Sequence, residues 1–344
     1  MVFMRWSKTA LVCAAMATIL LGGQATATAD DGIAHIVSRA TASTDGSHLD
    51  HIERVDDRRI DLYVYSAAMN KVFQQVVLLP KDTSAPRPTL YLLDGGNGGE
   101  STVTWRTQTD IVPFFADKNV NVVLPIGGEF SYYTDWQHDD PVLGRNKWKT
   151  YLTEELPAIV DSALGTTGKN AIAGLSMSGT SVLALAEAAP NLYQSVGAFS
   201  GCADTSSPIG AAYVSTTVIP SGGNPTNMWG PYGSPGWVAN DPYVHADKLR
   251  GKALFISSGN GLPGPHDTLN DPSVDGQLRQ LGVQIGVGGV IEAATNECTH
   301  RLAGRLDSLG IPATFSFPPG THSWGYWQDA LHNSWPVLGS AIGS

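Results

Sequence analysis

Short apolar runs alternate with longer amphipathic stretches along most of the chain. The runs that indicate strands lie at 89–96, 120–128, 170–176, 195–201, 252–261 and 313–322, and a strand pair is predicted within 58–80. Apolar residues at helical spacing predict helices at 147–164 and 289–310, and two further helices are predicted after residues 176 and 322. This order is typical of an α/β fold, in which helices cover both faces of a mostly parallel sheet.

The ends of these strands are where chemistry is expected, because active sites of parallel sheets form beyond the carboxyl ends of the strands. The residues at those ends are Asp94 to Gly96, Gly127 and Gly128, Ser176, Gly201, Gly259 and His322. Catalytic residues are therefore sought first among these positions.

The stretch 202–247 interrupts the alternation. It is rich in glycine, proline and aromatic residues and has little periodicity. Long ordered loops in compact domains are usually functional, so we expect a loop-rich insertion that walls the active site. The chain has no internal repeat, and residues 30–344 are expected to form a single catalytic domain.

The first 29 residues have the parts of a secretory signal peptide. Arg5 and Lys8 precede the run TALVCAAMATILLGG, which is too short to span a bilayer comfortably. A small-x-small triplet then predicts cleavage near Ala29. A retained membrane anchor is the alternative. No later segment is long and apolar enough to be transmembrane. The mature chain is therefore expected to be secreted or held in the cell envelope.

The chain of 344 residues is acidic, with a formal net charge of -10. This charge argues against bulk electrostatic binding to nucleic acid or to an anionic bilayer. Cleavage would remove Cys13 and leave Cys202 and Cys298, an even number that favours one disulfide in an oxidising compartment. Two separate buried thiols are the alternative. Two cysteines match no metal-site spacing, and neither a metal nor a cofactor is predicted.

The segment AIAGLSMSGTSVLALA carries the first candidate for catalysis. A nucleophile elbow needs a strand, a sharp turn with small flanking residues, and a helix whose N-terminus faces the reacting oxygen. Ser176 follows a predicted buried strand and precedes a predicted helix. The pattern is G-x-S-x-S rather than G-x-S-x-G, but Ser178 is small enough for a tight turn. Ser176 is therefore the predicted nucleophile, and an ordinary strand-to-helix turn is the alternative.

A serine nucleophile needs a base and an acid. His322 comes directly after the last predicted strand, and the order serine then histidine agrees with the α/β-hydrolase arrangement. Topology alone favours an acid soon after the strand at 252–258, namely Asp267 or Asp271, whereas Glu292 and Glu297 come later on a helix. The histidines interpreted as solvated are His138, His245, His266, His300 and His332.

Seven motifs together resemble the secreted mycolyltransferases, the antigen 85-like family. They are YLLDG, PIGGEFSYYTDW, KWKTYLTEELP, GLSMSG, NMWGP, SGNGLP and FPPGTHSWGYW, in this order from about residue 60 to about residue 330. The resemblance implies an α/β-hydrolase fold. It also implies transfer of mycolyl groups from trehalose monomycolate to a second trehalose monomycolate or to cell-wall arabinogalactan.

The resemblance also implies roles for single residues. The family's nucleophile falls on Ser176, its histidine on His322, and its acid on Glu292, with Glu297 as the fallback and Asp267 ranked below Glu292. The implied oxyanion donors are the backbone N–H groups of Gly96 and Met177.

Three further residues take their expected roles from the same resemblance. Asp94 matches the family's trehalose-binding aspartate. Trp324 matches a tryptophan that can pack on a sugar face, with a core aromatic as the alternative. The family's usual arginine near Asp94 is Asn97 here, so sugar binding at that position is expected to differ.

A bridge from Cys202 to Cys298 would tether the helix of the acid beside the site.

Two rival functions use the same residues differently. A secreted carboxylesterase would have the same triad with water as the acceptor, and product analysis with and without trehalose separates the two. A non-catalytic envelope-binding homologue would keep the fold without the chemistry, and a fluorophosphonate probe would then fail to label Ser176.

Overall fold

The computed structural model describes residues 25–344, with side chains from residue 32 onwards. The basic and apolar parts of the predicted signal peptide, with Cys13, lie outside the described residues. The first described helix, α1 (Ala25–Arg39), runs through the predicted cleavage point after Ala29, and cleavage there stays a prediction. Within residues 25–344, no helix has the length and apolar character that a membrane span requires.

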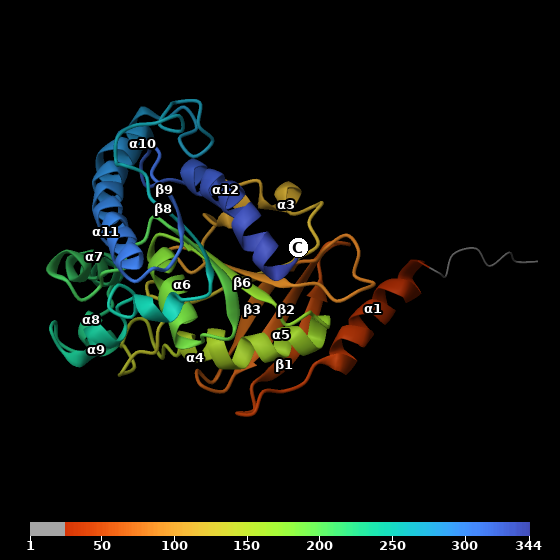
Figure 1. Cartoon of the computed structure of the whole chain (residues 1–344). Helices are drawn as coiled ribbons and strands as arrows, with labels where there is room; N and C mark the ends of the chain where they lie inside the picture. Colours follow the sequence, from red (N-terminus) through yellow and green to blue (C-terminus); the bar gives the residue numbers. More distant parts are fainter. Residues whose placement is uncertain (1–24) are drawn as a thin grey trace, which may run out of the picture.

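The strands of residues 25–344 form one nine-stranded sheet in the order β1-β2-β3-β5-β4-β6-β7-β8-β9 (Figure 1). The first three strands and the β3–β5 pair are antiparallel, and the remaining pairs are parallel. The bounds are β1 (His48–Arg54), β2 (Arg59–Ser66), β3 (Lys71–Leu78), β4 (Thr89–Leu93), β5 (Asn121–Pro125), β6 (Asn170–Leu175), β7 (Tyr193–Phe199), β8 (Ala253–Ser257) and β9 (Thr314–Ser316). The predicted mostly parallel sheet is confirmed.

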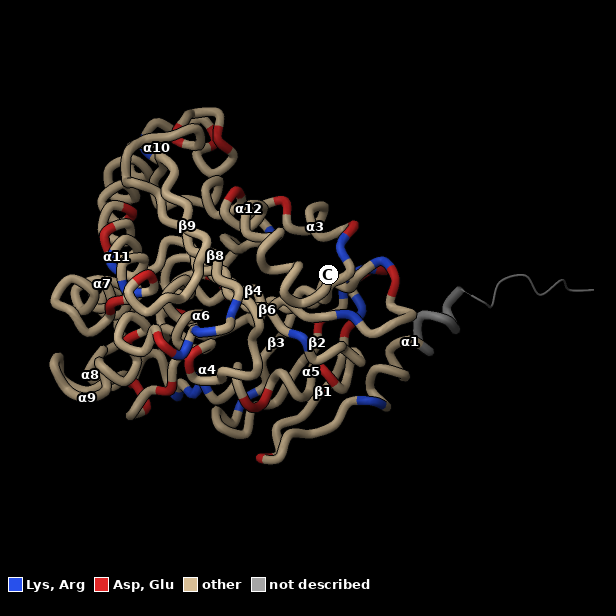
Figure 2. The backbone as a smooth tube through the Cα atoms, viewed as in Figure 1, with Lys and Arg blue, Asp and Glu red and all other residues tan. Residues whose placement is uncertain are grey.

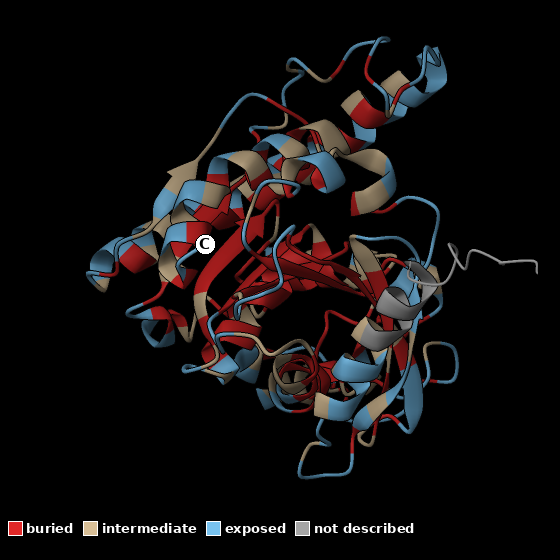
Figure 3. Ribbon diagram, turned by 90° about the vertical axis from the view of Figure 1, so that its right-hand side faces the viewer, coloured by how far each residue is buried: buried red, intermediate tan, exposed pale blue. Residues whose placement is uncertain are grey.

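Helices cover both faces of the sheet, so the central strands are buried at every position. Successive side chains of a strand point to opposite faces. Tyr91 and Leu93 of β4 belong to the apolar cluster that includes residues of α5 (Leu156–Leu164) and α6 (Met177–Ala188). Leu90 and Leu92 belong to the cluster on the other face, which includes residues of α12 (Trp324–Ile342). Burial on both faces explains why these strands are continuous apolar runs in the sequence (Figure 3).

The remaining helices are α2 (Trp105–Gln108), α3 (Ile111–Phe114), α4 (Trp148–Thr150), the π-helix η1 (Tyr151–Glu155), α7 (Pro208–Val218), the 3₁₀ helix η2 (Ile219–Ser221), α8 (Pro225–Trp229), α9 (Pro235–Ala239), the 3₁₀ helix η3 (Ala246–Leu249), α10 (Leu278–Val283), the π-helix η4 (Gln284–Gly288) and α11 (Gly289–Ser308). Several of them also contribute to the two apolar clusters, among them α11 and η1 on one face and α2 and α3 on the other.

The segment 202–247 is rich in turns and loops, as expected, but three short helices that were not predicted lie between them. It contains α7, α8 and α9. Their first residues are Pro208, Pro225 and Pro235. Proline fits the first position of a helix, where its missing N–H leaves no bond unmade. The prolines that suggested a loop therefore mark where three short helices begin.

Strand β1 has no counterpart among the predicted elements. Its residues, HLDHIER, are mostly exposed, and β1 pairs only with β2 at the edge of the sheet. Without a buried face, an edge strand carries no alternation of apolar and polar residues. The element is therefore visible in the backbone pairing and not in the hydrophobic pattern.

Candidate active site

Ser176 lies at a sharp turn between β6 and α6. Its backbone has φ of 56° and ψ of -122°, in a region that residues other than glycine seldom adopt. Backbone strain of this kind concentrates at functional sites. The N–H of Ser176 donates to the carbonyl of Phe199 at 2.8 Å. The turn thus holds the Ser176 side chain at the carboxyl end of the sheet and at the N-terminus of a helix, as a nucleophile elbow requires.

The departure from G-x-S-x-G has a structural explanation. Ser178 is fully buried, and its hydroxyl accepts the N–H of Leu175 at 2.9 Å and lies 3.1 Å from the carbonyl oxygen of Leu93. A Cβ on Gly174 would lie 2.4 Å from the Ser178 Oγ, and one on Gly179 would lie 2.4 Å from the Phe199 carbonyl oxygen. Glycine is therefore required on either side, whereas the serine adds hydrogen bonds that tie the turn to β4.

The side chains of Ser176, His322 and Glu292 form a continuous hydrogen-bonded chain. His322 Nε2 lies 2.8 Å from the Ser176 Oγ, and His322 Nδ1 lies 2.7 Å from Glu292 Oε2. His322 comes from the turn before α12, and Glu292 comes from the first turn of α11. In this geometry the imidazole can take the proton of the serine hydroxyl while the carboxylate orients the ring.

The second oxygen of Glu292 has three donors. Glu292 Oε1 accepts hydrogen bonds from the Ser200 hydroxyl at 2.7 Å, the Ser258 hydroxyl at 3.1 Å and the N–H of Gly259 at 2.5 Å. The carboxylate is only 1% exposed, so these bonds supply the stabilisation that water would otherwise give an anion. Ser200 also has a positive φ of 53°, which marks a second strained position at the site. Neither Ser200 nor Ser258 was among the predicted site residues.

Trp327 is a further residue of the site that was not among the predicted ones. Its indole N–H donates to the Ser200 hydroxyl at 3.0 Å. Its ring lies 4.9 Å from the His322 ring at an interplanar angle of 87°. Trp327 therefore contacts both the imidazole and a residue that holds the acid. Its position, one helical turn after Trp324 in the same motif, is the signal that could have identified it.

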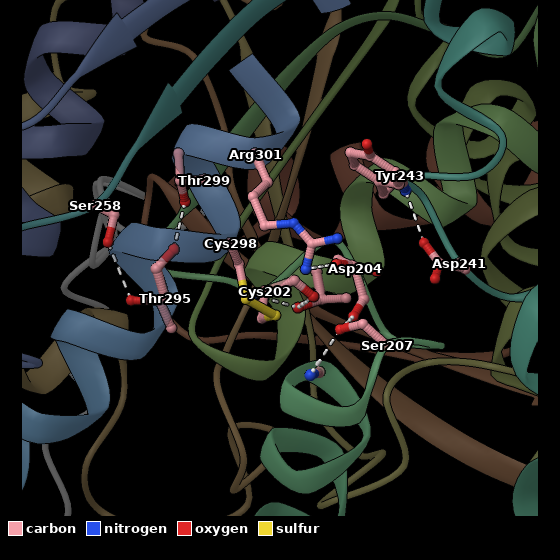
Figure 4. The surroundings of a disulfide bond; sticks show 12 residues. Cys202, Asp204, Ser207, Asp241, Tyr243, Ser258, Thr295, Cys298, Thr299 and Arg301 are labelled. Atoms are coloured by element: carbon pink, nitrogen blue, oxygen red, sulfur yellow. Dashed lines mark hydrogen bonds and ion pairs between the residues drawn. A yellow bond between two sulfur atoms is a disulfide. The ribbon is translucent and has the colours of Figure 1, made fainter. Parts of the chain in front are cut away.

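The predicted disulfide between Cys202 and Cys298 is confirmed, with the two Cα atoms 5.0 Å apart (Figure 4). Cys202 follows Ser200 after β7, and Cys298 lies on α11, the helix of Glu292. The Thr180 hydroxyl accepts the N–H of Cys202 at 3.0 Å, which attaches the same segment to α6. The bridge thus joins the two segments that hold the carboxylate.

The other candidate acids lie elsewhere. Glu297 is exposed on α11. Asp267 accepts hydrogen bonds from the Thr321 hydroxyl at 2.6 Å, the Tyr326 hydroxyl at 2.6 Å and the amide of Gln284 at 3.0 Å. Burial alone would raise the pKa of Asp267, but these hydrogen bonds outweigh it and lower the pKa. Asp267 therefore organises the segment next to His322 and does not contact the imidazole. Asp271 bonds to His266 and Ser273 instead.

The loop after β4 runs beside the nucleophile, since a Cβ on Gly95 would lie 3.6 Å from the Ser176 Cβ. The carbonyl of Gly96 accepts the N–H of Phe130 at 2.7 Å, and Met177 Sδ accepts the N–H of Tyr132 at 3.3 Å. Phe130 and Tyr132 have positive φ values of 52° and 55°. A strained segment after β5 thus supports both residues expected to donate to an oxyanion, and the donor role of Gly96 and Met177 stays a prediction.

Asp94 is buried rather than open to a sugar. It is 1% exposed, and its Oδ1 accepts the N–H of Trp105 at 3.1 Å. Its Oδ2 has no hydrogen-bond partner among the described residues. Burial raises the pKa of Asp94 from 3.8 to about 7, although the N–H of Trp105 and the charge of Arg106 oppose the shift. In this arrangement the carboxyl cannot contact a substrate directly.

Asn97 uses its side chain within its own loop. Its amide nitrogen donates to the Ser101 hydroxyl at 2.7 Å and to the carbonyl of Val103 at 2.6 Å, and its amide oxygen accepts the N–H of Gly99 at 3.0 Å. The amide therefore stabilises the loop from Asp94 to Trp105. The structure gives Asn97 a loop-stabilising position, and a direct contact with a sugar would require these bonds to break.

Trp324 is half-buried and packs mainly against other tryptophans. Its ring makes edge contacts with Trp105 at 5.7 Å and with Trp327 at 5.2 Å. These contacts favour the core-aromatic alternative for most of the ring, and packing on a sugar stays a prediction.

Helix α7 brings the segment 202–247 to the side of the nucleophile. The Tyr132 hydroxyl donates to the Thr217 hydroxyl of α7 at 3.3 Å, and the N–H of Tyr132 donates to Met177 Sδ, next to Ser176, at 3.3 Å. Burial raises the pKa of Tyr213, also on α7, and an interaction with the Ser176 side chain partly offsets the rise. Because 202–247 was interpreted as a loop, no helical position drew attention to this tyrosine.

Two histidines interpreted as solvated are in fact held by carboxylates. His266 Nδ1 lies 3.1 Å from Asp271 and its Nε2 2.8 Å from Asp329, and these carboxylates raise its pKa although burial opposes the rise. His332 lies 2.8 Å from Asp110 and stacks on Phe114. Neither contacts Ser176. Among residues 25–344, no cluster of histidine, cysteine or acidic side chains suits a metal ion.

The chain is similar to several known proteins. The family model described as "Putative esterase" matches residues 66–337. The chain is 33% identical over 273 residues to diacylglycerol acyltransferase/mycolyltransferase Ag85A of Mycobacterium leprae, covering 76% of this chain and 77% of that protein. It is 32% identical over 270 residues to Ag85B of Mycobacterium intracellulare, covering 75% and 76%. The solved structure of Mycobacterium tuberculosis MPT51 has a TM-score of 0.69 and 25% identity, covering 83% of this chain and 100% of that one. The architecture is the α/β-hydrolase fold.

Proposed function

Because the chain belongs to the esterase family that includes the antigen 85 acyltransferases and mycolyltransferases, we propose that it is a serine acyltransferase that transfers mycolyl groups. The donor is trehalose monomycolate. The acceptor is a second trehalose monomycolate or cell-wall arabinogalactan. Ser176 is the nucleophile, His322 the general base and Glu292 the acid of the triad.

The observation that carries this proposal is the hydrogen-bonded chain of 2.8 Å and 2.7 Å from the Ser176 hydroxyl through His322 to Glu292. A serine hydroxyl is a weak nucleophile unless an adjacent base takes its proton. The chain provides that base, and the carboxylate stabilises the imidazolium that forms.

In the first half-reaction, Ser176 Oγ attacks the carbonyl carbon of the mycolyl ester as its proton passes to His322 Nε2. The N–H groups of Met177 and Gly96 stabilise the resulting oxyanion, and a donor of this kind is worth about 3 kcal/mol. The tetrahedral intermediate then collapses. His322 returns the proton to the trehalose oxygen, trehalose leaves, and the acyl group remains on Ser176 as an ester.

In the second half-reaction, a hydroxyl of the acceptor sugar takes the place that trehalose left. His322 removes its proton, the hydroxyl oxygen attacks the acyl-enzyme, and Ser176 is released with its proton restored. Transfer exceeds hydrolysis only where the site positions the sugar hydroxyl and limits water. Helix α7 contacts Tyr132, which in turn contacts Met177 next to the nucleophile, and this covering of the site supports the requirement.

One observation favours a second candidate, a secreted carboxylesterase. Asn97 stands where the family has an arginine, and its hydrogen bonds are all made within its own loop. A site that binds the acceptor sugar more weakly would allow water to hydrolyse the acyl-enzyme more often. The two candidates share the acyl-enzyme and differ only in the acceptor.

The test is to incubate the purified protein with trehalose monomycolate and to identify the products by mass spectrometry. The proposal expects trehalose dimycolate and free trehalose as the main products, and loss of both with the Ser176→Ala variant. Free mycolic acid as the dominant product, with added trehalose causing no change, would establish the carboxylesterase instead. A wild-type protein that a fluorophosphonate probe fails to label would support a non-catalytic role.

The place of action follows from the same proposal. The predicted signal peptide with cleavage near Ala29 supports export to the cell envelope, where mycolate esters would be encountered. N-terminal sequencing of the exported protein would test the cleavage position.

A further inference from the structure

The loop that carries His322 needs support from outside the sheet. It follows β9, a strand of only three residues at the edge of the sheet, and it contains Pro318 and Pro319, which have no N–H to donate. The position of this loop matters for catalysis, because a displacement of about 1 Å in an active site can lower the rate about a hundredfold. The contacts that hold the loop are therefore part of how the triad is assembled.

The residue before the catalytic histidine is tied to a buried carboxylate. Thr321 is fully buried, and its hydroxyl donates to Asp267 Oδ1 at 2.6 Å. Burial would raise the pKa of Asp267, but its hydrogen bonds outweigh burial and lower the pKa, so the carboxyl is an anion at neutral pH. Hydrogen bonds to an ionised acceptor are stronger than those between neutral groups. Thr321 is thus firmly anchored one residue away from the imidazole.

Each oxygen of the Asp267 carboxylate has two donors. Besides the hydroxyl of Thr321, Oδ1 accepts the amide of Gln284 at 3.0 Å. Oδ2 accepts the hydroxyl of Tyr326 at 2.6 Å and the N–H of Gly264 at 2.8 Å. These donors come from the π-helix η4, from α12 and from the loop after β8. Asp267 therefore joins three elements to the loop that carries the histidine.

The aromatic ring of Tyr326 packs against the same loop. A Cβ on Gly320 would lie 2.6 Å from the Tyr326 ring, so the ring lies directly against the backbone two residues before His322. The hydroxyl of this tyrosine is the one that donates to Asp267. The loop is thus fixed both by the ring of Tyr326 and by the carboxylate that its hydroxyl contacts.

The charge of Asp267 is not balanced by a basic residue of its own loop. Residues 258–277 include aspartates at 267, 271 and 275 but no lysine or arginine, and Figure 2 shows red and no blue along the tube before α10. The four donors to Asp267 are all neutral, so the carboxylate keeps its full negative charge close to His322. A negative charge at this place favours the imidazolium that forms during catalysis.

We propose that Asp267 is a positioning residue for the acyl transfer, and that it acts through Thr321 to hold His322 in the triad. This inference rests on the proposed acyltransferase function. It gives the histidine a second carboxylate, because Glu292 orients the imidazole ring whereas Asp267 fixes the backbone beside it.

The test compares two substitutions at one position of the full chain. Thr321→Val keeps the shape of the side chain without its hydroxyl, and Thr321→Ser keeps the hydroxyl. Thr299→Val is the matched control, because Thr299 is also buried and its hydroxyl bonds only within its own helix, to the carbonyl of Thr295 at 2.8 Å. Values of kcat and KM are measured on a short, soluble ester. Crystal structures give the distance from His322 Nε2 to Ser176 Oγ in each protein.

We expect Thr321→Val to lower kcat by about tenfold or more and to leave KM within about twofold of wild type, because the base is displaced while the binding surface is intact. The distance from the imidazole to the serine hydroxyl should exceed about 3.5 Å in this variant. Thr321→Ser should recover kcat to within about threefold of wild type, and Thr299→Val should match wild type. A folded Thr321→Val protein with the kcat of wild type, or a Thr321→Ser protein that recovers nothing, would overturn the proposal.

A second arm tests whether Asp267 acts through Thr321. Asp267→Asn should lower kcat by about tenfold, and the double variant Asp267→Asn/Thr321→Val should lose no more than the larger of the two single losses. Losses that multiply in the double variant would show that the two residues act independently and would overturn the proposal. A folded Asp267→Asn protein with the kcat of wild type overturns it even if Thr321→Val does not fold.

The crystal structures separate this proposal from the proposed function. If the imidazole leaves the serine in Thr321→Val and stays beside it in Thr321→Ser, but wild type cleaves no ester, the proposed function fails while the positioning role stands. An imidazole that is equally well ordered and unmoved in Thr321→Val overturns the positioning role, whatever the activity of wild type.

Discussion

The catalytic centre has two flanks that differ in how completely their polar groups are paired. On the acid flank, Glu292 accepts hydrogen bonds from His322, Ser200, Ser258 and Gly259. A disulfide joins the segment of Ser200 to α11, the helix of Glu292. On the loop flank, Asp94 is buried, and its Oδ2 has no hydrogen-bond partner among the described residues. The hydroxyl of Tyr133 is also buried without a hydrogen-bond partner among these residues. An unpaired buried polar group costs about 1–3 kcal/mol.

This difference indicates that the acid flank is preorganised for catalysis and that the loop flank can change its conformation. The acid flank needs no rearrangement to orient the imidazole. The loop flank stores unfavourable free energy that a change in the loop from Asp94 to Trp105 can release. Sugar recognition, which the resemblance assigns to Asp94, would accompany such a change. Four substitutions test this difference between the flanks. They are described in order of decreasing expected effect.

Substitution at the acid flank should affect catalysis most. Glu292→Gln keeps the shape of the side chain but removes the charge that stabilises the imidazolium, so kcat should fall by about 10³ to 10⁴. Initial rates of ester cleavage by the purified variant measure the effect, with Glu297→Gln, an exposed position on the same helix, as the control. A fall of less than tenfold would contradict the role of Glu292.

Removal of the disulfide tests the rigidity of the same flank. Replacing Cys202 and Cys298 by alanine should lower the free energy of unfolding by about 2–5 kcal/mol, because the unfolded chain is no longer constrained. Urea unfolding monitored by circular dichroism gives this value. If the bridge also positions Glu292, kcat should fall in the folded variant while KM changes little. An unchanged free energy of unfolding would show that the bridge contributes nothing to stability.

On the loop flank, Asp94 should make stability depend on pH. Burial raises its pKa from 3.8 to about 7, so the folded protein binds a proton that the unfolded chain releases. Its contribution to stability is therefore full below about pH 4 and is lost as pH rises through about 7. Asp94→Asn should remove this loss and raise the free energy of unfolding at pH 8 relative to wild type by about 1–3 kcal/mol, with less gain at pH 5. Equal changes at both values of pH would argue that the carboxyl does not titrate there.

The smallest effect is expected at Asn97. Asn97→Ala removes three hydrogen bonds within the loop, each worth about 0.5 kcal/mol, because Asn97 is only partly buried and water replaces much of each bond. Stability should fall by about 1–2 kcal/mol, and the ratio of transfer to hydrolysis should fall by about threefold as the loop loosens. The ratio is read from the products with labelled trehalose. A rise in this ratio would mean that Asn97 restricts sugar binding instead.

Much of the fold could be predicted from the hydrophobic pattern, because buried strands and amphipathic helices leave periodic signals. Strands β4 to β8 and helices α5, α6 and α11 are of this kind. Strand β1 is exposed at an edge, and α7, α8 and α9 are short helices that begin with proline, so neither group has a clear period. The boundaries of the missed elements depend on tertiary contacts that a linear pattern does not contain.

The candidate site shows the same division between local and long-range information. Ser176 and His322 each stand at the end of a predicted strand, so local sequence could place them. The acid could not be placed in this way, and topology alone favoured Asp267 or Asp271 over Glu292. Ser200 and Ser258 contact Glu292 only because distant segments converge, and nothing in their own neighbourhoods distinguishes them. Trp327 differs, because its place one helical turn after Trp324 is a local signal.

The most direct test of the account is to trap the acyl-enzyme. The protein is mixed with a slowly turned-over long-chain ester, quenched in acid, digested and analysed by tandem mass spectrometry. We expect an acyl adduct on Ser176 in wild type, none with Ser176→Ala, and formation slowed by about 10³-fold or more with His322→Ala. An adduct on another residue would contradict the role of Ser176 as nucleophile, and one that forms at the wild-type rate without His322 would contradict the role of His322 as base.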